Sequence, residues 1–407
     1  MLRRNMLIAG STALALASTI GFTGCASPGH GKMTSEHLAQ AEQRMGDMRA
    51  ATEWDMAHQQ FMAGDLDKSL KTVDNSISMS SSVAKSHALR GRILYELGQT
   101  DTALDTFKRA LAIDPEYVEA HYYIGMIHER FREYDRSMDA YLTAATLDPS
   151  NPQYPLAAAE MFIETDQLDA AEQILFERKD RFEHNAGFRQ TLGHIAMMRG
   201  NDLEASEFFK EARLLAPEDE SILEDLAIAL VGSEQYADAD YTLGRLLKDS
   251  HPGDRRDLEH LRVRCLIELD RPVEARSILL SLTKGIDGAS DIRAWFELGQ
   301  IAYKIGDMRR LKITASRLSA MAPNRYEGYF LMAAWQRHTG DLEGALASLN
   351  KSAAMTNDES SPMLFRGLVL RELGEQDDAI KSFAEALRID PGNKDAELLL
   401  SAVVEDN

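Results

Sequence analysis

The sequence places few side chains in the patterns that support catalysis or metal binding. His121 and His128 are seven residues apart, too far for two metal ligands on neighbouring turns of one helix. Glu129 follows His128, but the second His of a zinc-binding helix is missing. Asp238 and Asp240 lack the Gly and the distal Glu of a calcium loop. The chain also has no nucleophile elbow and no phosphate-binding Gly loop. We therefore expect a protein that is not an enzyme and that binds no metal and no cofactor.

Charge and cysteine content exclude further classes of protein function. The 407 residues include 65 Asp and Glu against 45 Lys and Arg, a formal net charge of −20. Such an acidic chain lacks the positive face that phosphate backbones need, so we expect no nucleic-acid partner, and no motif indicates a small-molecule substrate. Two Cys exclude a disulfide framework, and Cys265 is interpreted as a buried core residue. The apolar share of 44% is ample for a core.

The first residues have the order of a secretory signal peptide. Arg3 and Arg4 precede a mostly apolar run from residue 6 to residue 20. Phe22-Thr23-Gly24-Cys25 then resembles the lipobox of bacterial lipoproteins. The resemblance implies that residues 1–24 are removed and that the Cys25 thiol is alkylated by a diacylglyceryl group. The alternative is an ordinary signal peptide that happens to contain a Cys.

The residues after Cys25 indicate where the protein would be held. Ala26 stands where an Asp would resemble an inner-membrane retention signal, so the family rule points to the periplasmic face of the outer membrane. Pro28, Gly29 and Gly31 make residues 25–33 a flexible linker. We therefore expect a lipid-anchored body close to the membrane surface.

The rest of the chain is an internal repeat of about 34 residues. Pro115, Pro149, Pro217, Pro323 and Pro391 recur at or near multiples of that length. A second column of mostly small residues has the same spacing. It consists of Ser69, Ala103, Ser137, Ala171, Ala205, Ala239, Ala275, Leu311, Ala345 and Ala379.

This pattern resembles the tetratricopeptide repeat. Trp295, Leu298 and Gly299 reproduce the opening of its motif, and the later aromatic and Ala places recur in other repeats. The resemblance implies an all-α fold, a right-handed superhelical solenoid of about ten helix-turn-helix repeats with a C-terminal capping helix. Small residues at the Gly and Ala places would let the two helices of a repeat approach closely.

The helix ends can also be predicted. A Gly that ends the first helix of a repeat supplies the left-handed backbone that such an end favours. Six repeats have one: Gly64, Gly98, Gly200, Gly306, Gly340 and Gly374. Asp65, Asp307 and Asp341 follow directly and are expected to cap the second helix.

These signals divide the mature chain into segments. We expect a helix at 34–49, ten repeats at 50–393, and a capping helix and tail at 394–407. In the capping helix, Ala396, Leu399, Leu400 and Val403 are predicted to face inward. Two repeats are lengthened by connections within 245–292, and we predict that this region bends or loosens the solenoid.

The resemblance also implies a concave groove lined by the first helix of each repeat. A peptide or another protein is the usual partner there, and aromatic side chains would anchor it. The register places eight such residues near the groove: Trp54, His58, Phe61, Tyr95, Tyr122, Phe296, Tyr303 and Phe330. The alternative for each is packing between adjacent repeats.

The expected function is a non-catalytic interaction scaffold. Similar anchored repeat proteins serve in pilus or secretion-pore assembly or in polysaccharide export, and assembly of such an envelope machine is the favoured interpretation. The alternative is an adaptor that regulates a periplasmic peptidoglycan hydrolase or protease.

Overall fold

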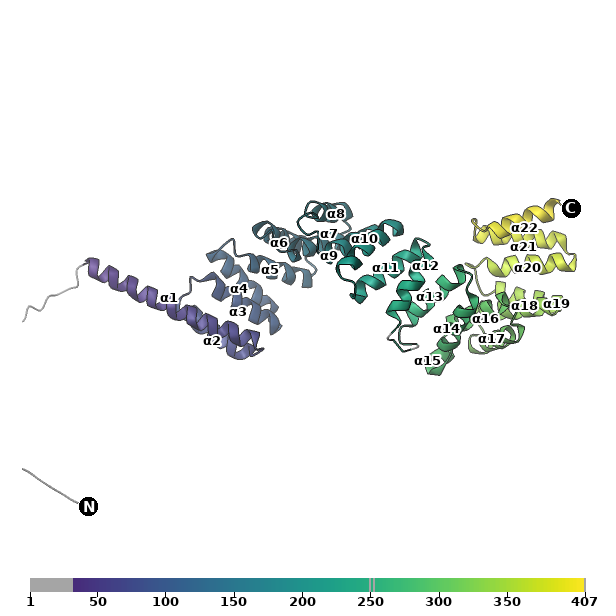
Figure 1. Ribbon diagram of the computed structural model, residues 1–407, viewed down its shortest axis with the longest axis horizontal. Coiled ribbons are helices and arrows are strands. Elements are labelled where there is room, and N and C mark those ends of the chain that lie inside the picture. The colour runs from purple at the N-terminus through teal and green to yellow at the C-terminus, as the bar shows by residue number, and fades with distance from the viewer. Residues whose placement is uncertain (1–31, 249, 252, 406–407) are drawn as a thin grey trace, which may run out of the picture. The chain divides into compact units, whose positions relative to one another are not determined.

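The computed structural model describes residues 32–405 apart from 249 and 252, and this part of the chain is helical with no strand. Helices follow one another as pairs joined by short turns, and each helix packs mainly against its neighbour in sequence (Figure 1). The expected all-α repeat fold is therefore confirmed.

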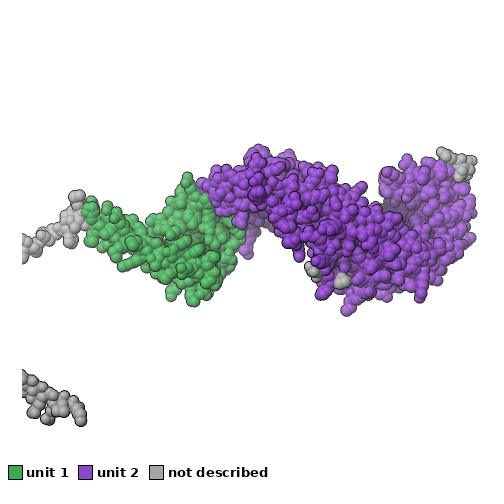
Figure 2. All heavy atoms as spheres, viewed as in Figure 1, with its two compact units in different colours: residues 1–127 green, residues 128–407 purple. Residues whose placement is uncertain are grey.

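The chain divides into two compact units, residues 1–127 and residues 128–407 (Figure 2). The boundary falls inside α5. The helices of unit 1 are α1 (Lys32–Met62), α2 (Leu66–Met79), α3 (Ala84–Glu96), α4 (Thr100–Ile113) and most of α5 (Val118–Arg130).

Unit 2 holds the remaining helices. They are α6 (Tyr134–Leu147), α7 (Gln153–Glu164), α8 (Leu168–Phe176), α9 (Ala186–Met198), α10 (Asp202–Leu215), α11 (Glu220–Gly232), α12 (Tyr236–Leu246), α13 (Arg256–Glu268), α14 (Pro272–Leu282), α15 (Gly285–Ser290), α16 (Ile292–Lys304), α17 (Met308–Met321), α18 (Tyr326–His338), α19 (Leu342–Ala353), α20 (Ser361–Leu373), α21 (Gln376–Ile389) and α22 (Lys394–Glu405).

The turn between the two helices of a repeat has the same left-handed backbone throughout. All six predicted Gly residues have a positive φ, for example 76° at Gly98 and 85° at Gly374. Four repeats reach the same conformation without Gly, at Arg132, Asp166, Glu234 and Asp270, with φ between 53° and 60°. A residue with a Cβ is disfavoured there, so these four turns carry backbone strain that Gly would not have.

The small residues allow close helix packing, as predicted. Every member of the column from Ser69 to Ala379 is fully buried. A Cβ built on Gly91, Gly193 or Gly367 would lie within 2.7 Å of a Phe ring of the second helix. The Gly of the first helix and the Phe of the second therefore form one interlocking contact.

Helix caps follow the prediction in part. Asp307 accepts a hydrogen bond from the Arg310 N–H and Asp341 accepts one from the Gly344 N–H, both at 3.0 Å. Asp65 occupies the same cap position but makes no capping bond, and its carboxylate pairs with Lys68 at 3.1 Å.

The two ends of the repeat array are both helical. The helix expected at 34–49 and the first helix of the first repeat are one continuous helix, α1. Side chains from residue 36 to residue 49 are almost all exposed. At the other end, α22 buries Ala396 and Val403 and half-buries Leu399 and Leu400, as predicted for a capping helix.

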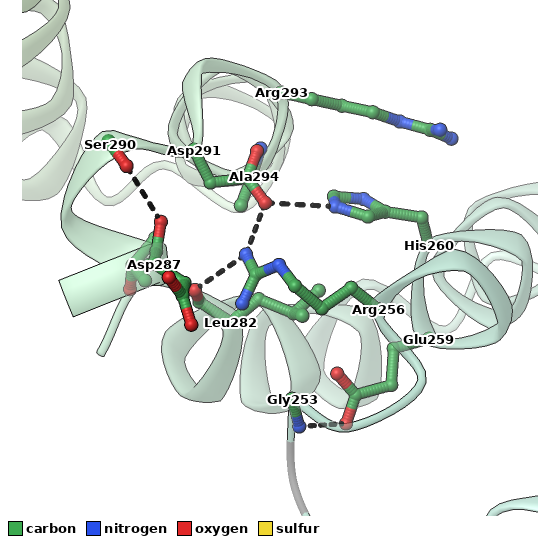
Figure 3. Close-up of polar contacts among 12 residues, drawn as sticks. Gly253, Arg256, Glu259, His260, Leu282, Asp287, Ser290, Asp291, Arg293 and Ala294 are labelled. Carbon is green, nitrogen blue, oxygen red and sulfur yellow. Dashed lines mark hydrogen bonds and ion pairs between the residues drawn. The ribbon is translucent and has the colours of Figure 1, made fainter. Parts of the chain in front are cut away.

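The lengthened connections in 245–292 build a polar joint between α13 and α16. Figure 3 shows the Asp291 carboxylate between the Arg256 guanidinium and the His260 ring. Asp291 also caps α16 by accepting the Ala294 N–H at 2.9 Å. The other ring nitrogen of His260 lies 2.7 Å from Glu297 Oε2.

This joint changes the acidity of Asp291. Burial by itself would raise the pKa of Asp291, but hydrogen bonds from the Ala294 N–H, Arg256 and His260 outweigh burial and hold this pKa below its ordinary value. The ionised carboxylate is therefore part of the folded structure. Bending of the solenoid at this region stays a prediction.

Within the described chain, no helix combines the length and the apolar character needed to cross a membrane.

Candidate functional site

The eight residues of the predicted groove all lie on first helices, and they are divided between the two units. Trp54, His58 and Phe61 are on α1, Tyr95 is on α3 and Tyr122 is on α5. Phe296 and Tyr303 are on α16 and Phe330 is on α18. The predicted lipidation residue, Cys25, lies outside the described residues.

Trp54 is fixed by two ring contacts and one hydrogen bond. It stacks on His58 with ring centroids 5.1 Å apart, and the Lys85 ammonium lies 4.3 Å from the indole centroid. The indole N–H donates a hydrogen bond to the Lys85 carbonyl at 3.1 Å. The polar edge of the ring is thus satisfied internally, and the partly exposed ring presents apolar surface.

Arg92, on α3, links aromatic residues of the two neighbouring first helices, α1 and α5. Its guanidinium lies 4.7 Å from the Phe61 ring centroid and 5.5 Å from that of Tyr123. Its Nη1 donates to Glu119 at 2.7 Å, while its buried Nε has no hydrogen-bond partner among the described residues. Each cation–π contact of this kind contributes roughly 0.5–2 kcal/mol, so the side chains are held in place before any partner arrives.

Tyr123 belongs to this cluster but was not predicted. It stacks on Phe107 at 5.2 Å and meets Tyr95 and Tyr122 edge-on, each at 5.8 Å. Burial raises the pKa of Tyr123, partly offset by the charge of Arg92. The repeat register predicts Tyr122 and not Tyr123. Contacts with Tyr95, Phe107 and Arg92 of the previous repeat identify Tyr123. We call Trp54, Phe61, Arg92, Tyr95, Tyr122 and Tyr123 the aromatic face of unit 1.

A second aromatic cluster lies in unit 2, where packing between repeats dominates. Phe330 is only 6% exposed and lies 4.9 Å from Phe365 and 6.2 Å from Phe296, centroid to centroid. Tyr303 contacts Phe365 at 6.2 Å and accepts a long hydrogen bond from Arg337 at 3.5 Å. Phe330 is therefore buried by packing between adjacent repeats, whereas Phe296 and Tyr303 are half-exposed. Phe365 was not predicted.

The chemistry available on the aromatic face of unit 1 is that of recognition. Partly exposed rings offer apolar area, and Lys85 and Arg92 offer cations beside them. Over the described residues, no three His, Cys, Asp or Glu side chains gather as a metal site.

Comparison with known proteins agrees with this fold. A family model described as tetratricopeptide repeat matches residues 88–152 and 339–394. No curated protein matches the chain.

Several solved structures resemble parts of the chain. A tetratricopeptide repeat protein from Parabacteroides merdae is 16% identical, over 62% of this chain and 99% of that one, with a TM-score of 0.44. Yeast Tom70 is 14% identical, over 88% and 89%, with a TM-score of 0.43. PilW, a type IV pilus biogenesis factor, is 17% identical, over 49% and 93%, with a TM-score of 0.44.

The helical pairs define the class as an all-α repeat protein, and the family match identifies tetratricopeptide repeats within residues 88–152 and 339–394. Repeats outside the two matched stretches have the same turn backbone and the same buried column of small residues.

Proposed function

We propose that the protein is a non-catalytic scaffold anchored to the outer membrane through Cys25. In this proposal it holds a protein or peptide partner on the periplasmic side. It does so during assembly of an envelope machine, such as a pilus, a secretion pore or a polysaccharide exporter.

The anchor rests on the first residues of the chain. A basic start, an apolar run and Phe22-Thr23-Gly24-Cys25 support lipidation, and several acyl chains on one Cys give a stable anchor. The short linker that follows would keep the repeats near the membrane, where envelope machines are assembled.

The observation that carries partner binding is the aromatic face of unit 1. Three successive first helices present partly exposed rings that stacking and cation–π contacts already hold in place. A surface ordered in advance loses less side-chain entropy when a partner binds. Tyr and Trp are also the side chains that most often dominate binding energy.

The test is cross-linking in intact cells followed by affinity capture of the tagged full chain and identification of its partners. Trp54→Ala and Arg92→Ala should each deplete the main cross-linked partner several-fold. Tyr241→Ala is the matched control, because Tyr241 is an exposed aromatic residue on a second helix, α12.

Each outcome decides between interpretations. Pilus, secretion-pore or polysaccharide-export components that disappear with Trp54→Ala would support the proposal. Capture of a peptidoglycan hydrolase or a protease would instead support the alternative, an adaptor that regulates such an enzyme. Cross-linked partners unaffected by both variants would overturn binding at the aromatic face.

A further inference from the structure

A cavity of about 400 Å³ opens between two first helices of unit 2, α7 and α9. Its lining includes Glu160, Ile163, Glu164, His194, Met197 and Met198. We call this the α7–α9 cavity. The repeat pattern by itself indicates no function for these residues.

The α7–α9 cavity occupies the same register as the aromatic face of unit 1. Met197 follows Ile163 by 34 residues, and Ile163 follows Phe61 by three times that spacing. Glu160 and His194 take the place of His58 in the same way. The repeat therefore presents side chains here in the way it presents Phe61 and His58, but with a different chemistry.

The apolar part of the cavity lining is adaptable. Met197, Met198 and Ile163 form it, and Met198 is 54% exposed. Unbranched thioether side chains adjust to the shape of what binds them. An apolar side chain of moderate size, such as Leu or Met, would gain burial there.

The rim of the cavity is acidic, and its lining includes one basic ring, that of His194. Glu160 and Glu164 line it, and no Lys or Arg does. No described basic side chain forms an ion pair with either carboxylate. His194 lies 2.8 Å from Asp225 of α11, and Gln190 donates to the same carboxylate at 2.8 Å. The imidazole is thus already engaged by another acid.

The electrostatics of Glu160 agree with this geometry. Partial desolvation raises the pKa of Glu160, the nearby charges of Glu129 and Glu164 raise it further, and the charge of His194 lowers it. The Glu129 carboxylate accepts a hydrogen bond from the Tyr141 hydroxyl at 2.6 Å and forms no ion pair with a described Lys or Arg. A positive group brought to this rim would relieve repulsion that the free protein retains.

We propose that the α7–α9 cavity binds an extended segment of a protein partner in which a Lys or Arg lies next to an apolar side chain. The apolar side chain enters between Ile163 and the two methionines, and the cation lies between Glu160 and Glu164. This inference rests on the proposed scaffold function and names the chemistry of a partner segment. Anionic ligands, including lipid headgroups and acidic peptide tails, would be repelled by the same rim.

The test uses three fluorescein-labelled peptides that differ at one position in a Gly/Ser frame: Leu-Lys-Leu, Leu-Ser-Leu and Leu-Glu-Leu. Binding to the full chain in detergent is followed by fluorescence anisotropy at low salt. The Lys peptide should bind about tenfold more tightly than the Glu peptide, with the Ser peptide between them. Raising the salt concentration should reduce the difference, because the rim is solvent-accessible.

Variants separate the two parts of the site. Glu164→Lys should weaken the Lys peptide and strengthen the Glu peptide. Glu160→Lys combined with Glu164→Lys should reverse the preference. Met198→Ser should weaken all three peptides alike. Glu207→Lys is the matched control for charge, since Glu207 is exposed on the second helix α10 and should change nothing.

The proposal is overturned if the three peptides bind equally, or if Glu164→Lys and Met198→Ser leave binding unchanged. Glu164 and Met198 are exposed, so both variants should fold, and circular dichroism melting checks this. The scaffold function has its own readout, because Trp54→Ala tests the aromatic face of unit 1. A failure at the α7–α9 cavity with a Trp54-dependent partner would remove this inference alone.

Discussion

At the scale of single residues, two kinds of position control how well a repeat packs. One is the left-handed turn, filled by Gly in six repeats and by a residue with a side chain in four. The other is the helical Gly that lies under a Phe ring. Both can be tested by substitution. Introducing Gly at a strained turn should raise the free energy of unfolding, and replacing the helical Gly should lower it.

Glu234→Gly should stabilise the protein. Glu234 has a φ of 60° and an exposed side chain, so Gly would relieve backbone strain without removing a buried contact. We expect a gain of roughly 0.5–1 kcal/mol after the greater entropy of Gly in the unfolded chain is deducted. Urea unfolding followed by circular dichroism measures it. Gly200→Ala, at the same place one repeat earlier, should lose about 1 kcal/mol, and a loss for Glu234→Gly would contradict the interpretation.

Gly193→Ala should destabilise the protein although it favours the helix. Its Cβ would lie 2.5 Å from the Phe209 ring, which is fully buried, and overpacking of this kind costs about 1–3 kcal/mol. Gly244→Ala in α12 is the control, because its Cβ would meet only the end of the flexible Arg262 side chain, in ordinary contact at 3.7 Å. That control should gain up to about 1 kcal/mol from helix propensity. Equal shifts in thermal melting for the two variants would disprove the contact.

At the scale of helices, the joint between α13 and α16 depends on one carboxylate. Asp291 caps α16 and pairs with Arg256 and His260, which both come from α13. Asn keeps the capping ability of Asp but not its charge, so Asp291→Asn isolates the electrostatic part.

Asp291→Asn should cost about 1.5–3 kcal/mol at neutral pH. The pKa of Asp291 is lowered in the folded protein, so its contribution is present above the ordinary Asp pKa of about 3.9 and is lost as pH falls through the folded value. The difference between wild type and variant should therefore shrink below about pH 4. Urea unfolding at neutral and acidic pH measures it. Asp287→Asn, an exposed neighbour, should have no effect at either pH.

The sequence predicted what recurs and missed what is particular to one repeat. The buried column, the six Gly turns and the capping helix could be predicted because ten copies of one pattern reinforce each other. Arg132 and Glu234 could not be predicted at left-handed turns, because their own preference opposes that backbone. Tyr123 and the α7–α9 cavity depend on contacts between neighbouring repeats, which spacing within one repeat does not contain.

At the scale of the whole molecule, the proposed anchor and the binding surfaces are separate properties. Cys25 precedes the first helix, whereas the aromatic face and the α7–α9 cavity belong to units 1 and 2 respectively. Loss of the anchor should therefore change where the protein is found and leave its folding intact.

Cys25→Ser should move the protein from the membrane fraction to the soluble periplasmic fraction, because no acyl chain can then be attached to the thiol. Fractionation of cells followed by immunoblotting measures this. Cys265→Ser controls for loss of a thiol, since Cys265 is buried in α13. Retention of the Cys25→Ser variant in the membrane after a salt wash would show that the lipid is not the anchor.

The difference between Gly turns and strained turns also affects the order in which the repeats would unfold. The terminal repeats of a linear array normally fray first, because each has only one neighbour. Here the first two and the last three turns all have Gly, whereas the four strained turns lie in the third, fourth, sixth and seventh repeats. The strained turns are thus confined to interior repeats, and the terminal repeats have unstrained Gly turns. On heating, the interior repeats should therefore unfold locally at nearly the same temperature as the terminal repeats. Limited proteolysis should cut within the interior repeats as well as near the two ends.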